Sequence, residues 1–137
     1  MKRVRVLLAE DGWAMARHLR AILAQDFDVL ATVGDGLALV RLVHEMHPDV
    51  VVTDISMPGL TGFEAVARLV GEHCDVGIVF ITVHAEPAVV SHAMALAPCA
   101  YVLKADAGDD LLPAVHAAVQ RRPYVSASLR WGGPTPV

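Results

Sequence analysis

The stretch Val50-Val51-Val52-Thr53-Asp54 decides the fold of this chain. Its first four residues are all branched at Cβ, which favours a strand over a helix. The run is continuous and does not alternate with polar residues, as is typical of a central strand covered on both faces of a parallel sheet. Asp54 ends this strand, and Ser56-Met57-Pro58-Gly59 predicts a sharp turn after it.

Short apolar runs alternate with stretches of helical periodicity on both sides of this strand. The apolar runs predict five strands, at residues 4–9, 28–33, 50–53, 77–81 and 100–103. The periodic stretches predict five helices, at residues 13–25, 37–46, 62–73, 87–96 and 109–121. Strands and helices that alternate through short connections predict an α/β fold, a doubly wound five-stranded parallel sheet with helices on both faces.

The pattern changes after Arg121. Residues 122–137 include Pro123 and the run Gly132-Gly133-Pro134, and they are too few to build a second core. We therefore expect one domain over residues 1–121. The remaining residues, 122–137, are interpreted as a C-terminal tail or linker.

Composition narrows the class of protein. The chain has 137 residues, is 55% hydrophobic and 19% charged, and has a net charge of −4. Acidic residues interrupt its longest apolar stretches, so we expect neither a membrane span nor membrane binding, and the N-terminus does not resemble a signal peptide. The acidic balance argues against nucleic-acid binding by this domain. Cys74 and Cys99 lack metal-type spacing and suit reduced thiols in the cytoplasm.

Ionisable residues follow three of the predicted strands. Glu10 and Asp11 follow the first strand, Asp54 follows the third, and Lys104 follows the fifth. Neighbouring parallel strands end at the same edge of a sheet, where ligands bind in α/β folds. The chain has two lysines against nine arginines, yet Lys104 closes an apolar run, where a buried charge needs a partner. These positions predict a site for a divalent metal and a phosphoryl group.

The chemistry assigns a role to each group. Three clustered carboxylates repel one another, and a hard dication such as Mg²⁺ relieves that conflict with oxygen ligands. Asp54 is the expected nucleophile, and it is already anionic, so phosphoryl transfer to it requires mainly positioning and charge neutralisation. Lys104 would neutralise phosphoryl oxygens. Thr82, at the end of the fourth strand, would offer them a hydroxyl.

Four separated motifs carry a family resemblance. They are Glu10-Asp11, Asp54 with Met57-Pro58-Gly59 and Gly62, Thr82 with His84-Ala85, and Tyr101-Val102-Leu103-Lys104. Together, at successive strand ends, they resemble the receiver domains of bacterial two-component response regulators over residues 4–121. The resemblance implies a flavodoxin-like fold with strand order 2-1-3-4-5.

The resemblance also implies an activity. Asp54 would accept a phosphoryl group from the phosphohistidine of a sensor histidine kinase. Asp11, Asp54 and the backbone carbonyl of Ser56 would ligate Mg²⁺, and Glu10 would reach the ion through water. Such a domain catalyses only its own phosphorylation and dephosphorylation and is not a conventional turnover enzyme.

The same resemblance suggests a readout. Thr82 would move toward the phosphoryl group and Tyr101 would rotate inward, repacking the face formed by the fourth helix, fifth strand and fifth helix for homodimer or partner binding. Ser56 and His84 occupy positions that tune the lifetime of the phosphoryl group in this family. Val83 stands where the family usually has a smaller residue, so we expect Val83→Ala to change that lifetime.

Several alternatives remain open at this point. Residues 121–126 resemble the junction to a helix-turn-helix output domain, which favours the regulatory part of a DNA-binding transcriptional regulator, shortened before that domain. A stand-alone receiver and an interaction module independent of phosphorylation are the alternatives. A haloacid-dehalogenase-like phosphohydrolase is disfavoured because Ser56 stands where its second Asp is usual. Flavin binding is disfavoured because the first loop lacks a hydroxyl-rich phosphate cradle.

One further cluster is ambiguous. His44, His47 and Asp49 have a spacing compatible with a metal site. No further ligand lies near them in the sequence, so we interpret them as the solvated end of the second helix.

Overall fold

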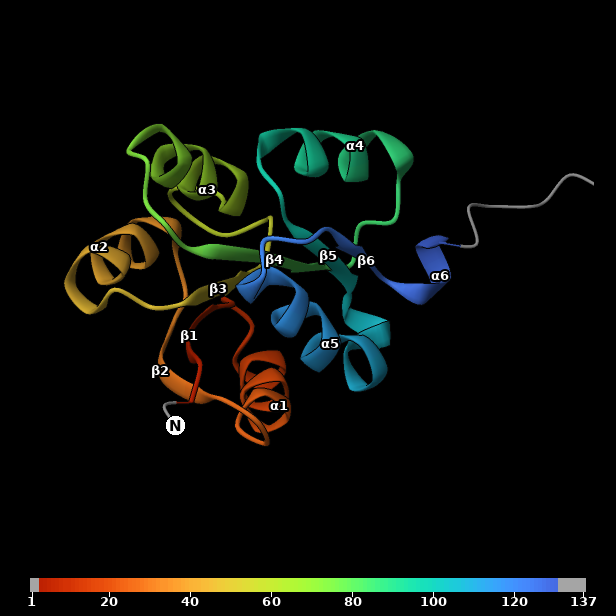
Figure 1. Ribbon diagram of the computed structural model, residues 1–137, viewed down its shortest axis with the longest axis horizontal. Coiled ribbons are helices and arrows are strands. Elements are labelled where there is room, and N and C mark those ends of the chain that lie inside the picture. Colours follow the sequence, from red (N-terminus) through yellow and green to blue (C-terminus); the bar gives the residue numbers. More distant parts are fainter. Residues whose placement is uncertain (1–2, 131–137) are drawn as a thin grey trace, which may run out of the picture.

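The computed structural model describes residues 3–130, which form a six-stranded parallel sheet with helices on both faces (Figure 1). Its strands are β1 (Arg5–Ala9), β2 (Asp28–Val33), β3 (Val50–Thr53), β4 (Gly77–Thr82), β5 (Ala100–Leu103) and β6 (Tyr124–Val125). Its helices are α1 (Trp13–Leu23), α2 (Gly36–Met46), α3 (Gly62–Gly71), α4 (Pro87–Leu96), the 3-10 turn η1 (Lys104–Asp106), α5 (Ala107–Val119) and α6 (Ala127–Arg130). The α/β class and the alternation of elements are confirmed.

The strand order is β2-β1-β3-β4-β5-β6, with parallel pairing throughout. The central position of β3 is confirmed, because all four of its residues are buried. Helices α1 and α5 cover one face of the sheet, and α2, α3 and α4 cover the other (Figure 1). Each face therefore has its own apolar core, which explains why the strand sequences are apolar without alternation.

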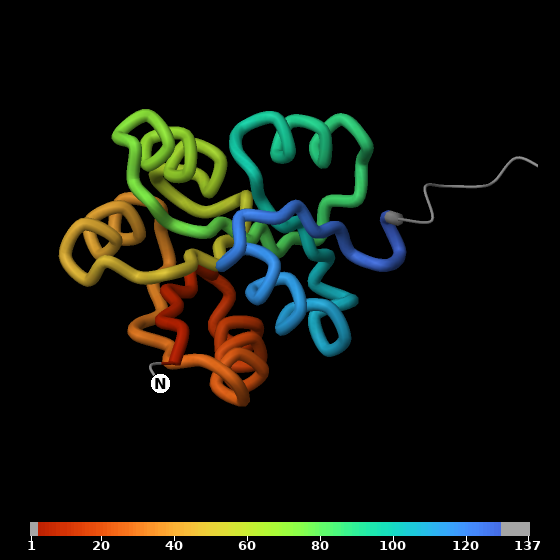
Figure 2. Tube along the Cα trace, in the orientation of Figure 1, coloured from red at the N-terminus to blue at the C-terminus, as the bar shows by residue number. Residues whose placement is uncertain are grey.

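The prediction of five strands is wrong by one. The trace returns to the sheet after α5 (Figure 2), and β6 adds to its edge with Ala100 opposite Tyr124 and Tyr101 opposite Val125. A strand of two residues is too short to produce a periodic signal in the sequence. The rest of the expected tail, residues 131–137, lies outside the described residues.

Local sequence explains where the helices next to the site begin and end. The Asp35 side chain accepts a hydrogen bond of 2.8 Å from the Ala38 N–H at the start of α2. Thr61 and Glu64 exchange hydrogen bonds in a capping box at the start of α3. His47 closes α2 in the left-handed conformation, with a φ of 48°, directly before Pro48. Fixed helix ends hold the connecting loops in place.

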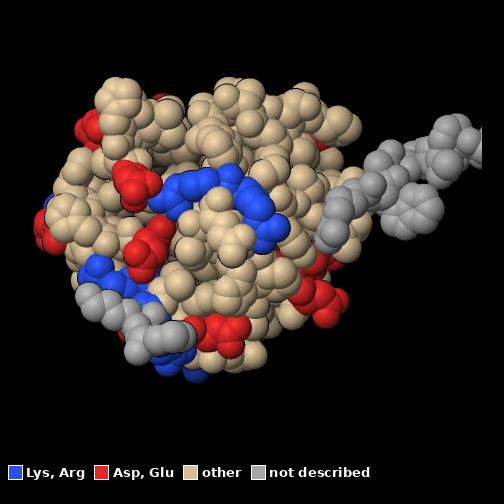
Figure 3. All heavy atoms as spheres, viewed as in Figure 1, with Lys and Arg blue, Asp and Glu red and all other residues tan. Residues whose placement is uncertain are grey.

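No helix within residues 3–130 combines the length and apolarity that crossing a membrane requires. The face seen in Figure 3 carries basic side chains next to acidic ones. One such pair joins Arg121 Nη2 to Asp75 Oδ1 at 2.6 Å.

Candidate functional site

The predicted site residues meet at the carboxyl edge of the sheet. The Glu10 N–H donates to the Val33 carbonyl at 2.9 Å, and the Asp54 N–H donates to the Ala9 carbonyl at 3.0 Å. The inter-strand ladder thus continues one residue past β1 and β3. This pairing fixes the two carboxylates next to each other on neighbouring strands, as the sequence predicts.

Lys104 joins the two carboxylates. Its Nζ lies 2.7 Å from Glu10 Oε1 and 2.8 Å from Asp54 Oδ2. Burial by itself lowers the pKa of Lys104, but the hydrogen bonds and negative charges of Asp54 and Glu10 outweigh burial, and the pKa is raised above its ordinary value. Lys104 is therefore a permanent cation at neutral pH, held against the expected nucleophile.

The Asp54 carboxylate is nearly buried, with 6% of the residue exposed. Its Oδ1 accepts a hydrogen bond of 2.7 Å from the Ile55 N–H, and the Ser56 N–H lies 3.4 Å from the same oxygen. These donors and Lys104 contact both oxygens of the Asp54 carboxylate. The structure thus holds the Asp54 side chain in one orientation.

Gly62 shapes the loop that carries Asp54. Its N–H donates to the Ile55 carbonyl at 2.7 Å. A Cβ at this position would lie 1.9 Å from the Asp54 carbonyl oxygen. Glycine is therefore required here for close backbone approach between the start of α3 and the residue after β3.

The carboxylate oxygens of Glu10, Asp11 and Asp54 lie within 4.8 Å of one another. Glu10 Oε2 accepts from the Gly12 N–H at 2.8 Å. Glu10 Oε1 is buried and, apart from its ion pair with Lys104, has no partner of regular hydrogen-bond geometry among the described residues. Clustered hard oxygens with unused lone pairs fit a Mg²⁺ ion. The predicted role of the Ser56 carbonyl stays a prediction.

His84 links the remaining predicted residues. Its N–H donates to Thr82 Oγ1 at 3.2 Å, and its Nε2 lies 3.4 Å from Ser56 Oγ. Its carbonyl accepts a hydrogen bond of 2.7 Å from the Tyr101 hydroxyl. Glu86, which sequence reasoning missed, lies 3.4 Å from His84 Nδ1. Thr82, Ser56 and Tyr101 thus form one polar unit around His84.

Tyr101 is fully buried, so its ring points inward. Burial is the main cause that raises its pKa to about 12, and the negative charges of Glu86 and Asp54 add to it. Val83 differs from these residues, because it is 71% exposed. The expected influence of Val83 on the lifetime of the phosphoryl group stays a prediction.

Sequence reasoning also missed the contacts of β6. Ser126 is buried, its N–H donates to the Tyr101 carbonyl at 2.8 Å, and its Oγ donates to Asp106 Oδ2 at 2.6 Å. The Tyr124 hydroxyl donates to Asp110 Oδ1 at 2.7 Å. Only the spacing of acidic residues around η1 could have indicated these contacts, and acidic residues there are equally expected at a helix start.

Fold and site together define a class of protein: a doubly wound domain with carboxylates and a lysine at the carboxyl edge of its sheet. Residues 6–116 match the family described as the response regulator receiver domain, and the chain belongs to that family.

Individual relatives agree with this assignment. The chain is 30% identical over 125 residues to the transcriptional regulatory protein DegU of Brevibacillus brevis, which covers 90% of this chain and 53% of DegU. It superposes on the signal receiver domain of the putative response regulator NarL from Mycobacterium tuberculosis with a TM-score of 0.83 and 26% identity, covering 89% of this chain and 100% of that one. It superposes on a DNA-binding response regulator of the LuxR family from Staphylococcus aureus with a TM-score of 0.79 and 27% identity, covering 85% of this chain and 98% of that one. The chain thus spans about half the length of DegU.

Proposed function

We propose that this chain is a phosphoacceptor switch in which Asp54 receives a phosphoryl group from the phosphohistidine of a sensor histidine kinase. The observation that carries this proposal is the pair of contacts from Lys104 Nζ to Asp54 and Glu10 at 2.8 and 2.7 Å. An Asp54 oxygen attacks phosphorus, the bond from phosphorus to the histidine nitrogen breaks, and that nitrogen keeps the electron pair. No general base is needed, because the carboxylate is already anionic.

Glu10, Asp11, Asp54 and the Ser56 carbonyl would hold Mg²⁺, with Glu10 acting through water. The ion supplies neutralisation of the charge on the transferring phosphoryl oxygens. Lys104 neutralises a further oxygen, and the Thr82 hydroxyl, now bonded to the His84 N–H, is the donor that would turn toward the product. The protein would catalyse only its own phosphorylation and dephosphorylation and would not turn over a separate substrate.

The readout would pass through the polar unit around His84. A phosphoryl group that draws Thr82 away from the His84 N–H changes the loop whose carbonyl holds the Tyr101 hydroxyl. Phosphorylation would then stabilise the arrangement with Tyr101 inward at the expense of others. The face of α4, β5 and α5 would then be the surface for homodimer or partner binding.

The likeness to transcriptional regulators supports a role in transcription. Residues 1–121 would form the receiver, and residues from 122 onward would lead to an output domain that binds DNA. The face seen in Figure 3 carries both basic and acidic side chains, which favours DNA binding by that output domain over DNA binding by this one. Both cysteines are free thiols, which supports a cytoplasmic setting.

The test is intact-mass spectrometry after incubation with acetyl phosphate, with and without Mg²⁺, for the wild type and Asp54→Asn. We expect the mass of one phosphoryl group to be gained only with Mg²⁺ and only by the wild type. No gain in folded, Mg²⁺-binding protein would contradict the proposal and favour an interaction module independent of phosphorylation.

A further inference from the structure

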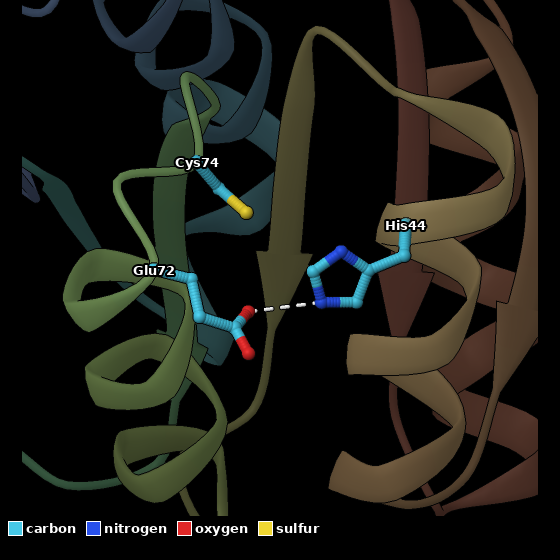
Figure 4. A group of neighbouring side chains, drawn as sticks. All are labelled: His44, Glu72 and Cys74. Atoms are coloured by element: carbon cyan, nitrogen blue, oxygen red, sulfur yellow. Dashed lines mark ion pairs between the residues drawn. The ribbon is translucent and has the colours of Figure 1, made fainter.

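Three side chains able to bind a soft or borderline metal meet at the edge of the sheet opposite Asp54 (Figure 4). His44 lies in the last turn of α2, and Glu72 and Cys74 lie in the connection from α3 to β4. Their ligand atoms, an imidazole nitrogen, a carboxylate oxygen and a thiol sulfur, all lie within 4.8 Å of one another. Figure 4 shows His44 and Cys74 pointing toward each other from two elements, with Glu72 next to both.

The separations are close to those of a tetrahedral site. Zinc–ligand bonds of roughly 2.0–2.3 Å place neighbouring ligand atoms about 3.3–3.8 Å apart. His44 Nε2 lies 2.9 Å from Glu72 Oε1, and the sulfur lies within 4.8 Å of both groups. The proposal requires the three ligand atoms to adjust from these separations to the spacing of a tetrahedral site.

The backbone holds the ligands in place. The Glu72 N–H donates to the Arg68 carbonyl at 3.0 Å, and the Cys74 N–H donates to the Leu69 carbonyl at 3.0 Å. On the other side, the His47 N–H donates to the Val43 carbonyl and closes α2. Both ligand-bearing segments are thus fixed before any ion binds, which lowers the ordering cost of binding.

The site is also accessible and has room for a fourth ligand. The side chains of His44 and Glu72 are 48% and 43% exposed. A hollow of about 240 Å³ is lined by His44, Cys74, His47 and Asp49 among others. Three protein ligands with space for water match zinc sites that keep an open position.

An ion pair between protonated His44 and Glu72 is the simpler explanation for their contact. It does not require Cys74, whose sulfur completes a nitrogen, oxygen and sulfur donor set. Thiolate and imidazole ligands select zinc and its neighbours over Mg²⁺, whereas the cluster around Asp54 offers oxygen ligands only. The two sites therefore differ in chemistry and lie at opposite edges of the sheet.

The geometry points to a Zn²⁺ site formed by His44 Nε2, the Glu72 carboxylate and the Cys74 thiolate, with water as the fourth ligand. From the sequence we interpret His44, His47 and Asp49 as the solvated end of the second helix, and of these residues only His44 belongs to the proposed site. His47 is used to close α2, and Asp49 Oδ2 accepts from the Arg5 N–H at 2.8 Å.

The test is a titration of the reduced chain with Co²⁺ and then Zn²⁺, in excess Mg²⁺ that saturates the oxygen-only cluster. We expect one Co²⁺ per chain, a thiolate-to-cobalt charge-transfer band in the near ultraviolet, and its loss when Zn²⁺ displaces Co²⁺. Cys74→Ser should abolish the band although Cys99 remains. His44→Ala and Glu72→Gln should weaken Zn²⁺ binding by more than about tenfold.

His18→Ala is the matched control, because it removes an exposed imidazole from α1, on the other face of the sheet, and should leave binding unchanged. Far-ultraviolet circular dichroism checks that each variant folds. Should Cys74→Ser fail to fold, the half-exposed positions His44 and Glu72 carry the test. Absence of the band, a band that survives Cys74→Ser, or equal loss in His18→Ala and His44→Ala would each overturn the assignment.

Discussion

Ser126 is the buried residue that attaches β6 to the sheet, and Ser126→Ala should destabilise this attachment by about 2–3 kcal/mol. Its Oγ donates to Asp106 Oδ2 at 2.6 Å and accepts from the Leu103 N–H at 3.2 Å. A hydrogen bond to a charged group contributes about 1.5–3 kcal/mol, and Asp106 is partly exposed, so we use the lower end. The unpaired Leu103 N–H adds about 1 kcal/mol.

The structure sets an upper limit on the free energy of unfolding that Ser126→Ala can remove. The two apolar cores are built almost entirely from residues before 120, so the chain can keep its sheet while residues 122–130 detach. Ser126→Ala therefore cannot cost more than the attachment itself contributes. Shortening the chain after Arg122 measures that contribution directly.

The assay is urea unfolding followed by circular dichroism, together with the thermal midpoint, which should fall by roughly 6–10 °C for a domain of this size. Ser128→Ala is the matched control. Its hydroxyl also donates to Asp106 Oδ2 but is exposed, so its loss should cost less than about 1 kcal/mol. Equal effects of the two substitutions, or a Ser126→Ala effect larger than that of the shortened chain, would refute the reasoning.

Three further predictions concern the site. Gly62→Ala should destabilise the domain by about 1–3 kcal/mol in urea unfolding, because its Cβ would meet the Asp54 carbonyl, whereas Gly71→Ala, with open space around it, should not. The pKa of Tyr101 should be about 12 in an ultraviolet titration. The free energy of unfolding that its buried neutral hydroxyl contributes should be complete below pH 10 and should be lost as the pH rises from 10 to about 12. Val83→Ala should change the phosphorylated lifetime several-fold in a mass-spectrometric decay assay, by roughly 1 kcal/mol of barrier, because the side chain directly after Thr82 becomes smaller; an unchanged lifetime contradicts this.

The main sheet and the carboxylate cluster could be predicted because both follow from local patterns plus one rule of topology. A continuous run such as 50–53 encodes a doubly covered strand without help from distant residues. Once the strands are parallel, Glu10, Asp54 and Lys104 must meet at one edge. The contacts of Lys104 with both carboxylates confirm that inference at atomic distances.

The parts that could not be predicted depend on contacts between distant segments. Strand β6 pairs with β5, and Ser126 directly after it binds Asp106 and the Tyr101 carbonyl; these partners lie about twenty or more residues earlier in the sequence. The His44 cluster shows the same limit. In the sequence His44 is close to His47 and Asp49, whereas in the structure Glu72 and Cys74 approach it from a different segment.

Strand β5 contacts both the loop next to the Asp54 site and the segment that begins at Ser126. At its carboxyl end it leads into Lys104, which holds Asp54 and Glu10. Within it, the Tyr101 hydroxyl binds the His84 carbonyl, while the Tyr101 backbone carbonyl accepts from the Ser126 N–H. Tyr101 is therefore bonded both to the loop that follows Thr82 and to the segment that begins at Ser126. Under the proposed function, a phosphoryl group on Asp54 would affect that segment only by changing the energy of these bonds, since a ligand shifts an equilibrium no further than its different interactions with the two states allow.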